Sequence, residues 1–217
     1  MVRVGRGLMI AVLVTIFIAP TASAGTGTQI RLSETLGELW TTVLELPSGE
    51  NPFTSDDKCV ELDQRGARRT IVPFSAAGST ITCEVPVATK IFVTAWTSEC
   101  STLEKDPYYG ADEPALRECA RDADSQLKDP IVTLDGRRLR LQEVETPLLN
   151  VVMPEDNILG VKQGASGQSV GHGWVVQINP LRVGTHTILI TNDGINAEGV
   201  DITGTNTTTI IVRPSWW

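Results

Sequence analysis

The feature that most constrains the fold is a run of short β-strand patterns between residues 131 and 213. In this region, apolar segments rich in Val, Ile and Leu alternate with turn residues, and no helical periodicity is present. Several short strands at such intervals are typical of two packed sheets or a barrel. Upstream, residues 90–96 (KIFVTAW) form a nearly continuous apolar run, which predicts a strand buried on both faces. We therefore expect a mainly β fold, specifically an antiparallel immunoglobulin-like β-sandwich.

Two hairpins are expected among these strand patterns. Asp135 and Gly136 interrupt the segment IVTLDGRRLRL, and this residue pair is typical of a tight hairpin turn. A second hairpin is expected between residues 70–74 and 79–86, which flank a turn-sized gap. Pro73 is expected to place the first strand of that hairpin at a sheet edge or a bulge, because proline cannot donate a backbone hydrogen bond.

Two helices are predicted to pack on the sheets. The first has Ser33 as its N-cap and ends before Pro47. Its apolar residues recur at helical spacing on one face: Leu36, Leu39, Trp40, Val43 and Leu44. The second has Asp112 as its cap, Pro114 in its first turn and Pro130 beyond its end. Its inner face is expected to hold Leu116, Cys119, Ala120, Ala123 and Leu127.

The four cysteines predict two disulfides. Cys59, Cys83, Cys100 and Cys119 contain no C-x-x-C pair, so the spacings of zinc ribbons and thioredoxin-like redox centres are absent. Four cysteines allow three pairings, and the sequence alone does not choose among them. We favour Cys59 with Cys83 and Cys100 with Cys119, because each then closes a local loop that contributes about 3 kcal/mol in the chain-entropy model.

The first 24 residues have the features of an export signal. Arg3 and Arg6 precede an uncharged apolar run from Leu8 to Ala19, and residues 22–24 (ASA) have the form that signal peptidase accepts. An apolar run of roughly 12 residues is too short to span a bilayer. We therefore expect cleavage after Ala24 and a secreted or periplasmic protein without membrane insertion.

The remaining chain is strongly acidic. The formal net charge of the full sequence is −8, and it becomes −10 once Arg3 and Arg6 leave with the signal peptide. Such a surface repels phosphate backbones and anionic lipids, so nucleic acid is not expected as a partner. Residues 25–217 are expected to form a single domain. The alternative is a division near residue 130 into a disulfide-bearing part (25–129) and an immunoglobulin-like part (130–217).

The two histidines of the chain, His172 and His186, raise the question of a shared metal or proton. If their strands pair as a hairpin across NPLRVG, His186 lies near Gln177 and His172 lies near Thr191. The histidines are then separated by roughly 17 Å, which one metal ion cannot bridge. The alternative is that NPLRVG carries the chain between sheets, which leaves the distance undefined. We expect core or strand-end histidines, and neither a metal nor a cofactor.

No catalytic residue stands out. Ser166 lies in a glycine-rich loop but is followed directly by Gly167, so the G-x-S-x-G pattern of a nucleophile elbow is absent. Glu155 and Asp156 are one of many acidic pairs that could serve glycoside hydrolysis, and nothing selects them.

Other short patterns leave alternatives open. The loop of residues 192–201 collects oxygen-bearing side chains that could hold calcium, although it lacks the EF-hand register and a plain turn is the alternative. Asn206 begins a glycosylation sequon, which has meaning only in a eukaryotic secretory host. Trp216 and Trp217 are expected to pack back on the domain, to meet a partner or to form a flexible tail.

Four segments together resemble a group of uncharacterised bacterial secreted proteins: ELWTTVLELPSGENPF, CEVPVATKIFVTAW, MPEDNILG and NPLRVGTHTI. This chain departs from that group in the turn from Pro86 to Lys90, which is longer by about one residue and lacks its glycine, and at Val183, where the group has proline. The resemblance implies a β-sandwich with added helices and a structural role for His186. Because the group has no established activity, the resemblance adds no catalytic residue.

The function expected from the sequence is a secreted, non-catalytic binding or cell-envelope module for an unknown protein or glycan partner. This hypothesis is based on the acidic composition and on the lack of a concentrated polar constellation. The alternative is a secreted hydrolase that uses carboxylates the sequence does not identify.

Overall fold

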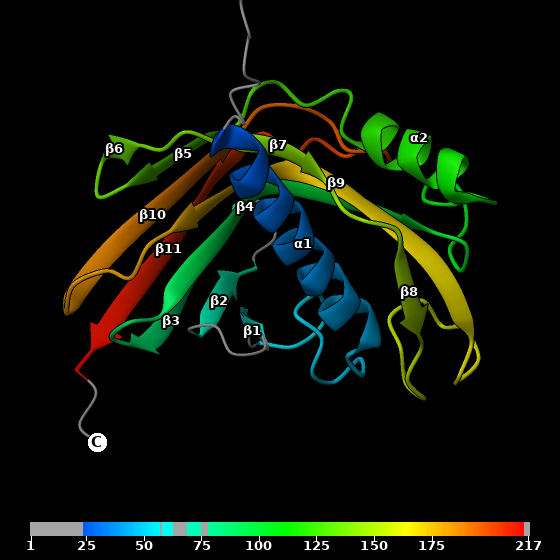
Figure 1. Cartoon of the computed structure of the whole chain (residues 1–217), viewed down its shortest axis with the longest axis horizontal. Coiled ribbons are helices and arrows are strands. Elements are labelled where there is room, and N and C mark those ends of the chain that lie inside the picture. The colour runs from blue at the N-terminus through cyan, green and yellow to red at the C-terminus, as the bar shows by residue number, and fades with distance from the viewer. Residues whose placement is uncertain (1–23, 57, 63–68, 75–77, 215–217) are drawn as a thin grey trace, which may run out of the picture.

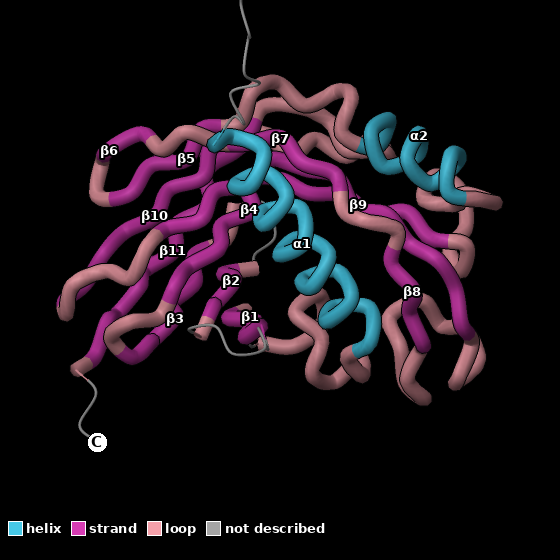
Figure 2. The backbone as a smooth tube through the Cα atoms, viewed as in Figure 1, coloured by secondary structure: helices cyan, strands magenta, loops and turns pink. Residues whose placement is uncertain are grey.

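The structure, a computed structural model, describes residues 24–56, 58–62, 69–74 and 78–214. Most of the expected signal peptide, together with Trp216 and Trp217, lies outside the described residues. The chain is mainly β, with two sheets, two helices and two disulfides (Figures 1 and 2). Within the described residues, neither helix combines the length and the hydrophobicity that a membrane crossing requires.

The first sheet, called sheet A here, has the strand order β1-β2-β4-β9-β7, and β8 also pairs with β9. Its strands are β1 (Cys59–Leu62), β2 (Thr70–Pro73), β4 (Lys90–Ser101), β7 (Gln142–Glu145), β8 (Leu149–Val152) and β9 (Ser166–Ile178). The second sheet, sheet B, has the order β3-β11-β10-β5-β6. Its strands are β3 (Thr80–Pro86), β5 (Ile131–Leu134), β6 (Arg137–Arg138), β10 (Gly184–Asn192) and β11 (Gly204–Arg213). Each sheet therefore contains strands from before and after residue 130.

Two strand pairings differ from the expected antiparallel arrangement. β2 pairs parallel with β4, and β3 pairs parallel with β11, so both sheets are mixed. The expected hairpin between β2 and β3 is wrong, because these strands belong to different sheets. β2 lies between β1 and β4 with Pro73 as its last residue, so it is not an edge strand. The alternation of side chains predicts a strand but not its partner, and here the partners lie far along the chain.

The hairpin at Asp135 and Gly136 is confirmed. β5 pairs antiparallel with β6, and the two turn residues have φ angles of 48° and 78°. Positive φ at both positions is what a two-residue turn of the I′ type requires, and a glycine adopts it without steric cost.

The main core lies between the two sheets. Apolar side chains of both sheets meet there, among them Val85, Ile91, Val93, Ile188, Ile190 and Ile210. Strand β4 is buried over most of its length, as its apolar sequence predicts. Because side chains alternate along a strand, the remaining residues of sheet A point to its other face, where they need a second cover.

Helix α1 (Ala24–Glu45) provides that cover (Figure 1). Its apolar stripe packs on Val72, Phe92 and Val175 of sheet A. The helix begins well before Ser33, so the expected N-cap is wrong. Ser33 lies inside the helix, and its hydroxyl donates a hydrogen bond of 2.5 Å to the backbone carbonyl of Glu145. A serine within a helix can bond outward in this way when a neighbouring strand offers an unpaired carbonyl.

Helix α2 (Glu113–Ala123) packs where β4 and β9 extend beyond sheet B. The Asp112 side chain accepts from the amide of Ala115, so this predicted cap is confirmed. The helix ends at Ala123, before Leu127, and buries Leu116 and Ala120 against β4 and β9.

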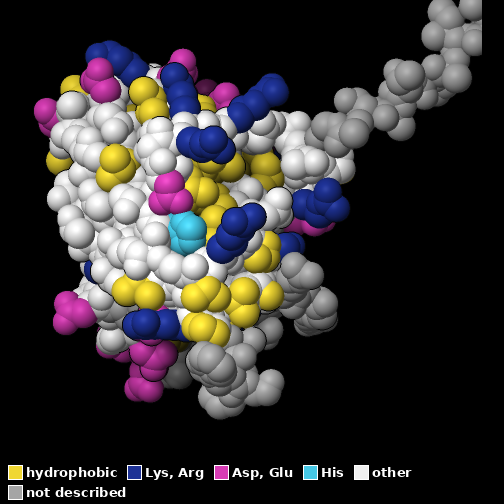
Figure 3. All heavy atoms as spheres, turned by 90° about the vertical axis from the view of Figure 1, so that its left-hand side faces the viewer, with side chains coloured by type: hydrophobic (Ala, Val, Ile, Leu, Met, Phe, Trp, Pro, Cys, Tyr) yellow, Lys and Arg dark blue, Asp and Glu magenta, His cyan; other side chains and the backbone are white. Residues whose placement is uncertain are grey.

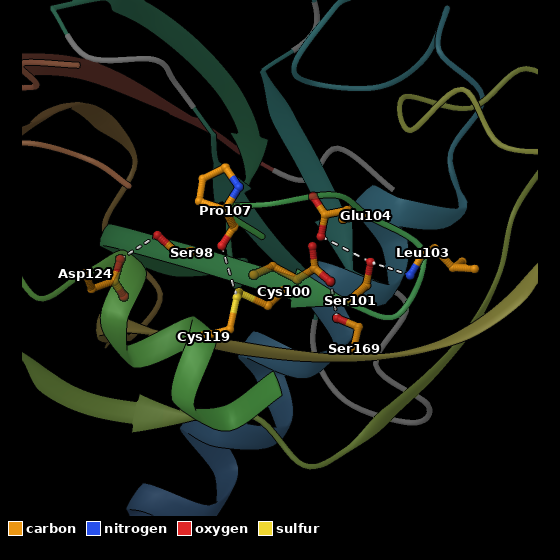
Figure 4. Close-up of a disulfide and its surroundings, with 10 residues drawn as sticks. Ser98, Cys100, Ser101, Leu103, Glu104, Pro107, Cys119, Asp124 and Ser169 are labelled. Atoms are coloured by element: carbon orange, nitrogen blue, oxygen red, sulfur yellow. Dashed lines mark hydrogen bonds between the residues drawn. A yellow bond between two sulfur atoms is a disulfide. The ribbon is translucent and has the colours of Figure 1, made fainter. Parts of the chain in front are cut away.

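The disulfides are the sequential pairs that the loop-length argument favours. Cys59 is bonded to Cys83 and connects β1 of sheet A to β3 of sheet B. Cys100 is bonded to Cys119 and fixes α2 beside β4 (Figure 4). One disulfide therefore links sheet A to sheet B, and the other links sheet A to α2.

The expected hairpin between the two histidine-bearing strands is wrong. β9, which holds His172, lies in sheet A, whereas β10, which holds His186, lies in sheet B. The segment NPLRVG therefore carries the chain between sheets, which was the alternative. Val176 of β9 and Ile188 of β10 both face the core between the sheets.

Candidate functional site

A β-bulge in β4 organises the candidate site. The register with β9 shifts between Thr94 and Trp96, so Ala95 and Trp96 both face the side of sheet B. Beyond the bulge, Ser98 and Cys100 point toward α2, while Thr97 and Glu99 point toward α1. One strand thus places polar groups on both faces of sheet A.

On the α2 side, Asp124 is the centre of a buried hydrogen-bond cluster. The carboxylate is 2% exposed and accepts from Trp96 Nε1 at 2.8 Å, Ser98 Oγ at 2.5 Å and His172 Nδ1 at 2.8 Å. Asp124 is also the C-cap residue of α2, and its own amide bonds back to Arg121 and Asp122. The cluster therefore fixes the end of α2 onto β4 and β9.

His172 is held by carboxylates at both ring nitrogens. Its Nε2 atom lies 3.2 Å from Glu143 Oε1, and its ring meets Trp174 edge-on. Burial by itself lowers the pKa of His172, but the hydrogen bond and charge of Asp124, together with Glu143, raise it above the ordinary value. The nearby Ser98 hydroxyl bonds to Asp124 rather than to Nε2, so this geometry does not form a Ser-His-Asp triad.

His186 lies at the other end of the molecule, with a carboxylate of its own. Its Nδ1 atom lies 2.8 Å from Asp135 Oδ2, and the backbone carbonyl of Arg182 accepts from Nε2 at 3.0 Å. These two hydrogen bonds raise the pKa of His186, and the same contact lowers the pKa of Asp135. Figure 3 shows a histidine side chain at the surface, next to acidic and basic side chains. The two histidines therefore have separate partners, and the described residues contain no group of metal-ligating side chains.

Next to the bulge, the surface is hollowed into two adjoining cavities of about 300 and 390 Å³. They share the lining residues Phe53, Trp96, Thr97 and Asn196, and together they are called the Trp96 cleft. The first hollow is lined further by Phe74, Ile190, Asn192 and Ile202. The second is lined further by Trp40, Glu99, Glu104, Tyr108 and Glu198.

Two interacting carboxyl groups lie in the second hollow. Glu99 is 5% exposed and accepts a hydrogen bond from Ser169 Oγ, while Glu104 accepts from Ser101 Oγ at 3.1 Å (Figure 4). Burial raises the pKa of Glu99 well above its ordinary value, and the charge of Glu104 raises it further. Burial also raises the pKa of Glu104, against hydrogen bonds with Glu99 and Ser101 that lower it. Because the two groups interact and both pKa values are raised, ionising both carboxyl groups together is costly.

The pKa of the Tyr108 phenol is also shifted by burial and by nearby carboxylates. Burial, followed by the charges of Glu198, Glu104 and Asp124, raises the pKa of Tyr108 to about 12. In the part of the chain that the structure describes, no Lys or Arg lines the second hollow. The second hollow is therefore an acidic compartment with aromatic walls.

Replacing Glu99 with Gln is expected to raise the melting temperature at pH 8 and to leave it nearly unchanged at pH 4. The pKa of Glu99 is higher in the folded state than in the unfolded state. The free energy of unfolding therefore falls as the pH rises beyond the unfolded pKa, because ionisation is less favourable in the folded protein. Gln can still accept from Ser169 and carries no charge. Thermal melts from pH 4 to pH 8 measure this, with the exposed Glu84→Gln as a control. A loss of stability at pH 8 would contradict the expectation.

The sequence did not identify these carboxylates. Glu99 lies three residues beyond the predicted strand of residues 90–96 and directly before Cys100, so the only signal for it is a charged residue close to the end of a buried strand. The acidic pair Glu155 and Asp156 lies outside the cleft lining, and Ser166 is the first residue of β9.

The loop of residues 192–201, for which calcium binding and a plain turn are the alternatives, uses many of its side-chain oxygens in internal hydrogen bonds. Asn196 Oδ1 accepts from the amides of Glu198 and Val200, Asp201 Oδ1 accepts from Thr203, and Asp193 pairs with Lys128. The structure therefore places this loop as a hydrogen-bonded turn at the rim of the Trp96 cleft, to which it contributes Asn196 and Glu198.

Comparison with known proteins gives no family for this chain. No family model matches it, and no curated protein is similar to it. Among solved structures, the cysteine protease inhibitor EhICP2 from Entamoeba histolytica is a weak match, with 12% identity and a TM-score of 0.21. The match covers 63% of this chain and 87% of that chain. A likeness at this TM-score carries no argument about this protein.

Proposed function

We propose that this protein is a secreted binding module whose ligand occupies the Trp96 cleft. The single observation that carries this proposal is the cleft itself, in which aromatic walls and polar groups from both sheets and from α1 converge. Ligand sites are concave and mostly apolar, with a few placed polar groups, and their volumes are of this size. The signal-like N-terminus, the acidic composition and the two disulfides support a secreted or periplasmic location.

The proposed scaffold is an immunoglobulin-like β-sandwich modified by α1 and α2. Two packed sheets with an apolar layer between them support this part of the proposal. The parallel pairs β2–β4 and β3–β11 are departures from a purely antiparallel sandwich.

A second candidate function is acid-catalysed hydrolysis, which the Glu99 and Glu104 pair favours. A buried carboxyl group that holds a proton can act as a general acid. These two groups are in direct contact, whereas glycoside hydrolysis needs carboxyl groups about 5 to 9.5 Å apart. Binding is therefore the better-supported function, and a broad hydrolase panel that gives turnover by the wild type but not by Glu104→Gln would reverse this order.

The binding proposal predicts that Phe53→Ala lowers ligand affinity about tenfold or more. Phe53 is 55% exposed and its side chain lines both hollows, so its removal deletes a contact surface for the ligand. Arrays of glycans, peptides and small organic molecules would be screened with the wild type, with Phe53→Ala and with a control variant. Val152→Ala is the matched control, since Val152 is 53% exposed on β8 and outside the cleft lining.

The expected result is at least one ligand class that the wild type and Val152→Ala bind equally and that Phe53→Ala binds more weakly. If no class binds, or if Phe53→Ala binds as well as the control, the proposed function is wrong.

A further inference from the structure

Along the Trp96 cleft, one edge of β4 pairs with no strand of the described segments. β9 pairs with β4 from Ile91 to Ser101, but on the other side β2 reaches only Lys90 and Ile91. Ser101 then forms an isolated bridge to Tyr109. Between Phe92 and Cys100, no strand among the described residues pairs with this second edge of β4.

The backbone groups on this edge lack the partners that a sheet normally supplies. In an antiparallel pair, every second residue directs its N–H and C=O away from the partner strand. In the described part of the chain, Asn192 Nδ2 donates to the carbonyl of Ala95 at 3.2 Å, and the other backbone groups on this edge from Val93 to Cys100 have no partner beyond β9. Unpaired backbone groups are costly when they are shielded from water, and they are a template for another strand.

The edge faces the cleft rather than lying beneath it. The consecutive residues from Thr94 to Glu99 all line one hollow or the other. A hollow above one face of a strand would be lined by alternate residues, because neighbouring side chains point to opposite faces. Lining by consecutive residues is what a groove along a strand edge produces.

We propose that an extended peptide segment of a partner protein enters the Trp96 cleft and pairs with this edge of β4 as an added strand. The inference rests on the proposed binding function and names the class of its ligand. Strand addition uses backbone hydrogen bonds for affinity and pockets for alternate side chains for specificity. Alternate side chains of the added strand would meet Trp40 and Phe53 on one side, and Ile190 and Ile202 on the other.

Charge and an unpaired acceptor define the peptide further. Glu104 and Glu198 line the second hollow without a basic neighbour among its described lining residues, so a Lys or Arg of the peptide is favoured there. At the first hollow, Lys58 lines the wall, but its ammonium bonds to the carbonyl of Pro52. Asn192 is 3% exposed and its Oδ1 atom has no hydrogen-bond partner among the described residues, so it can accept an N–H from the peptide.

The test uses synthetic octapeptides of alternating Val and Thr with one Lys at each position in turn. Binding to the full mature chain is measured by fluorescence polarisation. The tightest peptide is then remade twice, with N-methyl groups on its odd or on its even residues. Since only alternate amides face β4, one N-methylated form should bind at least about tenfold more weakly and the other nearly unchanged. The bound peptide should also slow hydrogen exchange between Thr94 and Glu99.

Two variants test whether the acidic hollow selects the Lys side chain of the peptide. Glu104→Gln should weaken the Lys peptide several-fold without weakening its norleucine analogue, and Val152→Ala should change neither. Equal binding of both N-methylated forms overturns the inference, as does a cleft that takes glycans or small molecules but no peptide from the set. In both cases the proposed binding function stands; it fails separately if no ligand class depends on Phe53.

Discussion

Replacing Asp124 with Ala is expected to lower the free energy of unfolding by about 3 to 5 kcal/mol, which is the usual cost of breaking a buried charged network. The substitution leaves Trp96 Nε1, Ser98 Oγ and His172 Nδ1 without their shared acceptor. The three donors are buried or half-buried, so water cannot replace the carboxylate fully. Urea unfolding followed by tryptophan fluorescence measures the loss directly.

The pH dependence of this loss has a defined sign. Asp124 helps to raise the pKa of His172, so the stability that His172 contributes is fully present below its unfolded pKa and disappears as the pH rises through the folded pKa. The Asp124→Ala penalty should therefore be larger at pH 6 than at pH 9. Asp124→Asn is the matched control, because it keeps an acceptor oxygen and should cost less than Ala at pH 9. Equal penalties for Ala and Asn at pH 9 would contradict this account of the cluster.

Removing the Cys59–Cys83 disulfide by double substitution to Ala is expected to cost about 3 kcal/mol. The bond spans 24 residues, and a loop of that length restricts the unfolded chain by this amount in the entropy model. Both cysteines contact the core between the sheets, and the bond holds β1 of sheet A to β3 of sheet B. Comparison of urea midpoints for the wild type and the double variant gives the cost.

The second disulfide is the matched comparison. Cys100 and Cys119 are separated by 19 residues, so loop length alone predicts a similar cost. Their bond holds α2 beside the Asp124 cluster, so its loss should also change the fluorescence of Trp96 in the native state. The Cys59–Cys83 variant should leave that native signal unchanged. Identical melting of oxidised and reduced wild-type protein would contradict both expectations.

Local signals in the sequence predicted the parts of this fold that depend on few neighbouring residues. The turn at Asp135 and Gly136, the cap at Asp112 and the buried strand that begins at Lys90 each follow from short-range geometry. The disulfides also follow from local loop length. In each case the residues that decide the structure lie within about 25 positions of one another.

Local sequence signals did not predict which strands pair with each other or which polar side chains meet. β3 lies beside β11, more than 100 residues further along the chain, and nothing in the alternation of Thr80–Pro86 specifies that neighbour. The candidate site has the same origin: Asp124 ends a helix, His172 lies in a distant strand, and only the fold brings them to 2.8 Å. Glu99 and Glu104 are close in sequence, but their significance depends on burial beneath the cleft.

The bulge at Ala95 has a consequence for how this protein can vary. It adds one residue to β4 relative to β9, so Ala95 and Trp96 share a face and the alternation of odd and even residues changes at this point. Deleting Ala95 would restore regular alternation, with Thr94 opposite Val175 and Trp96 opposite Trp174, so Trp96 and Glu99 would keep their faces. In lineages that share this architecture, loss of one residue at this point should therefore leave the faces of β4 unchanged, whereas loss of one residue between Thr97 and Cys100 would turn the side chains beyond it over.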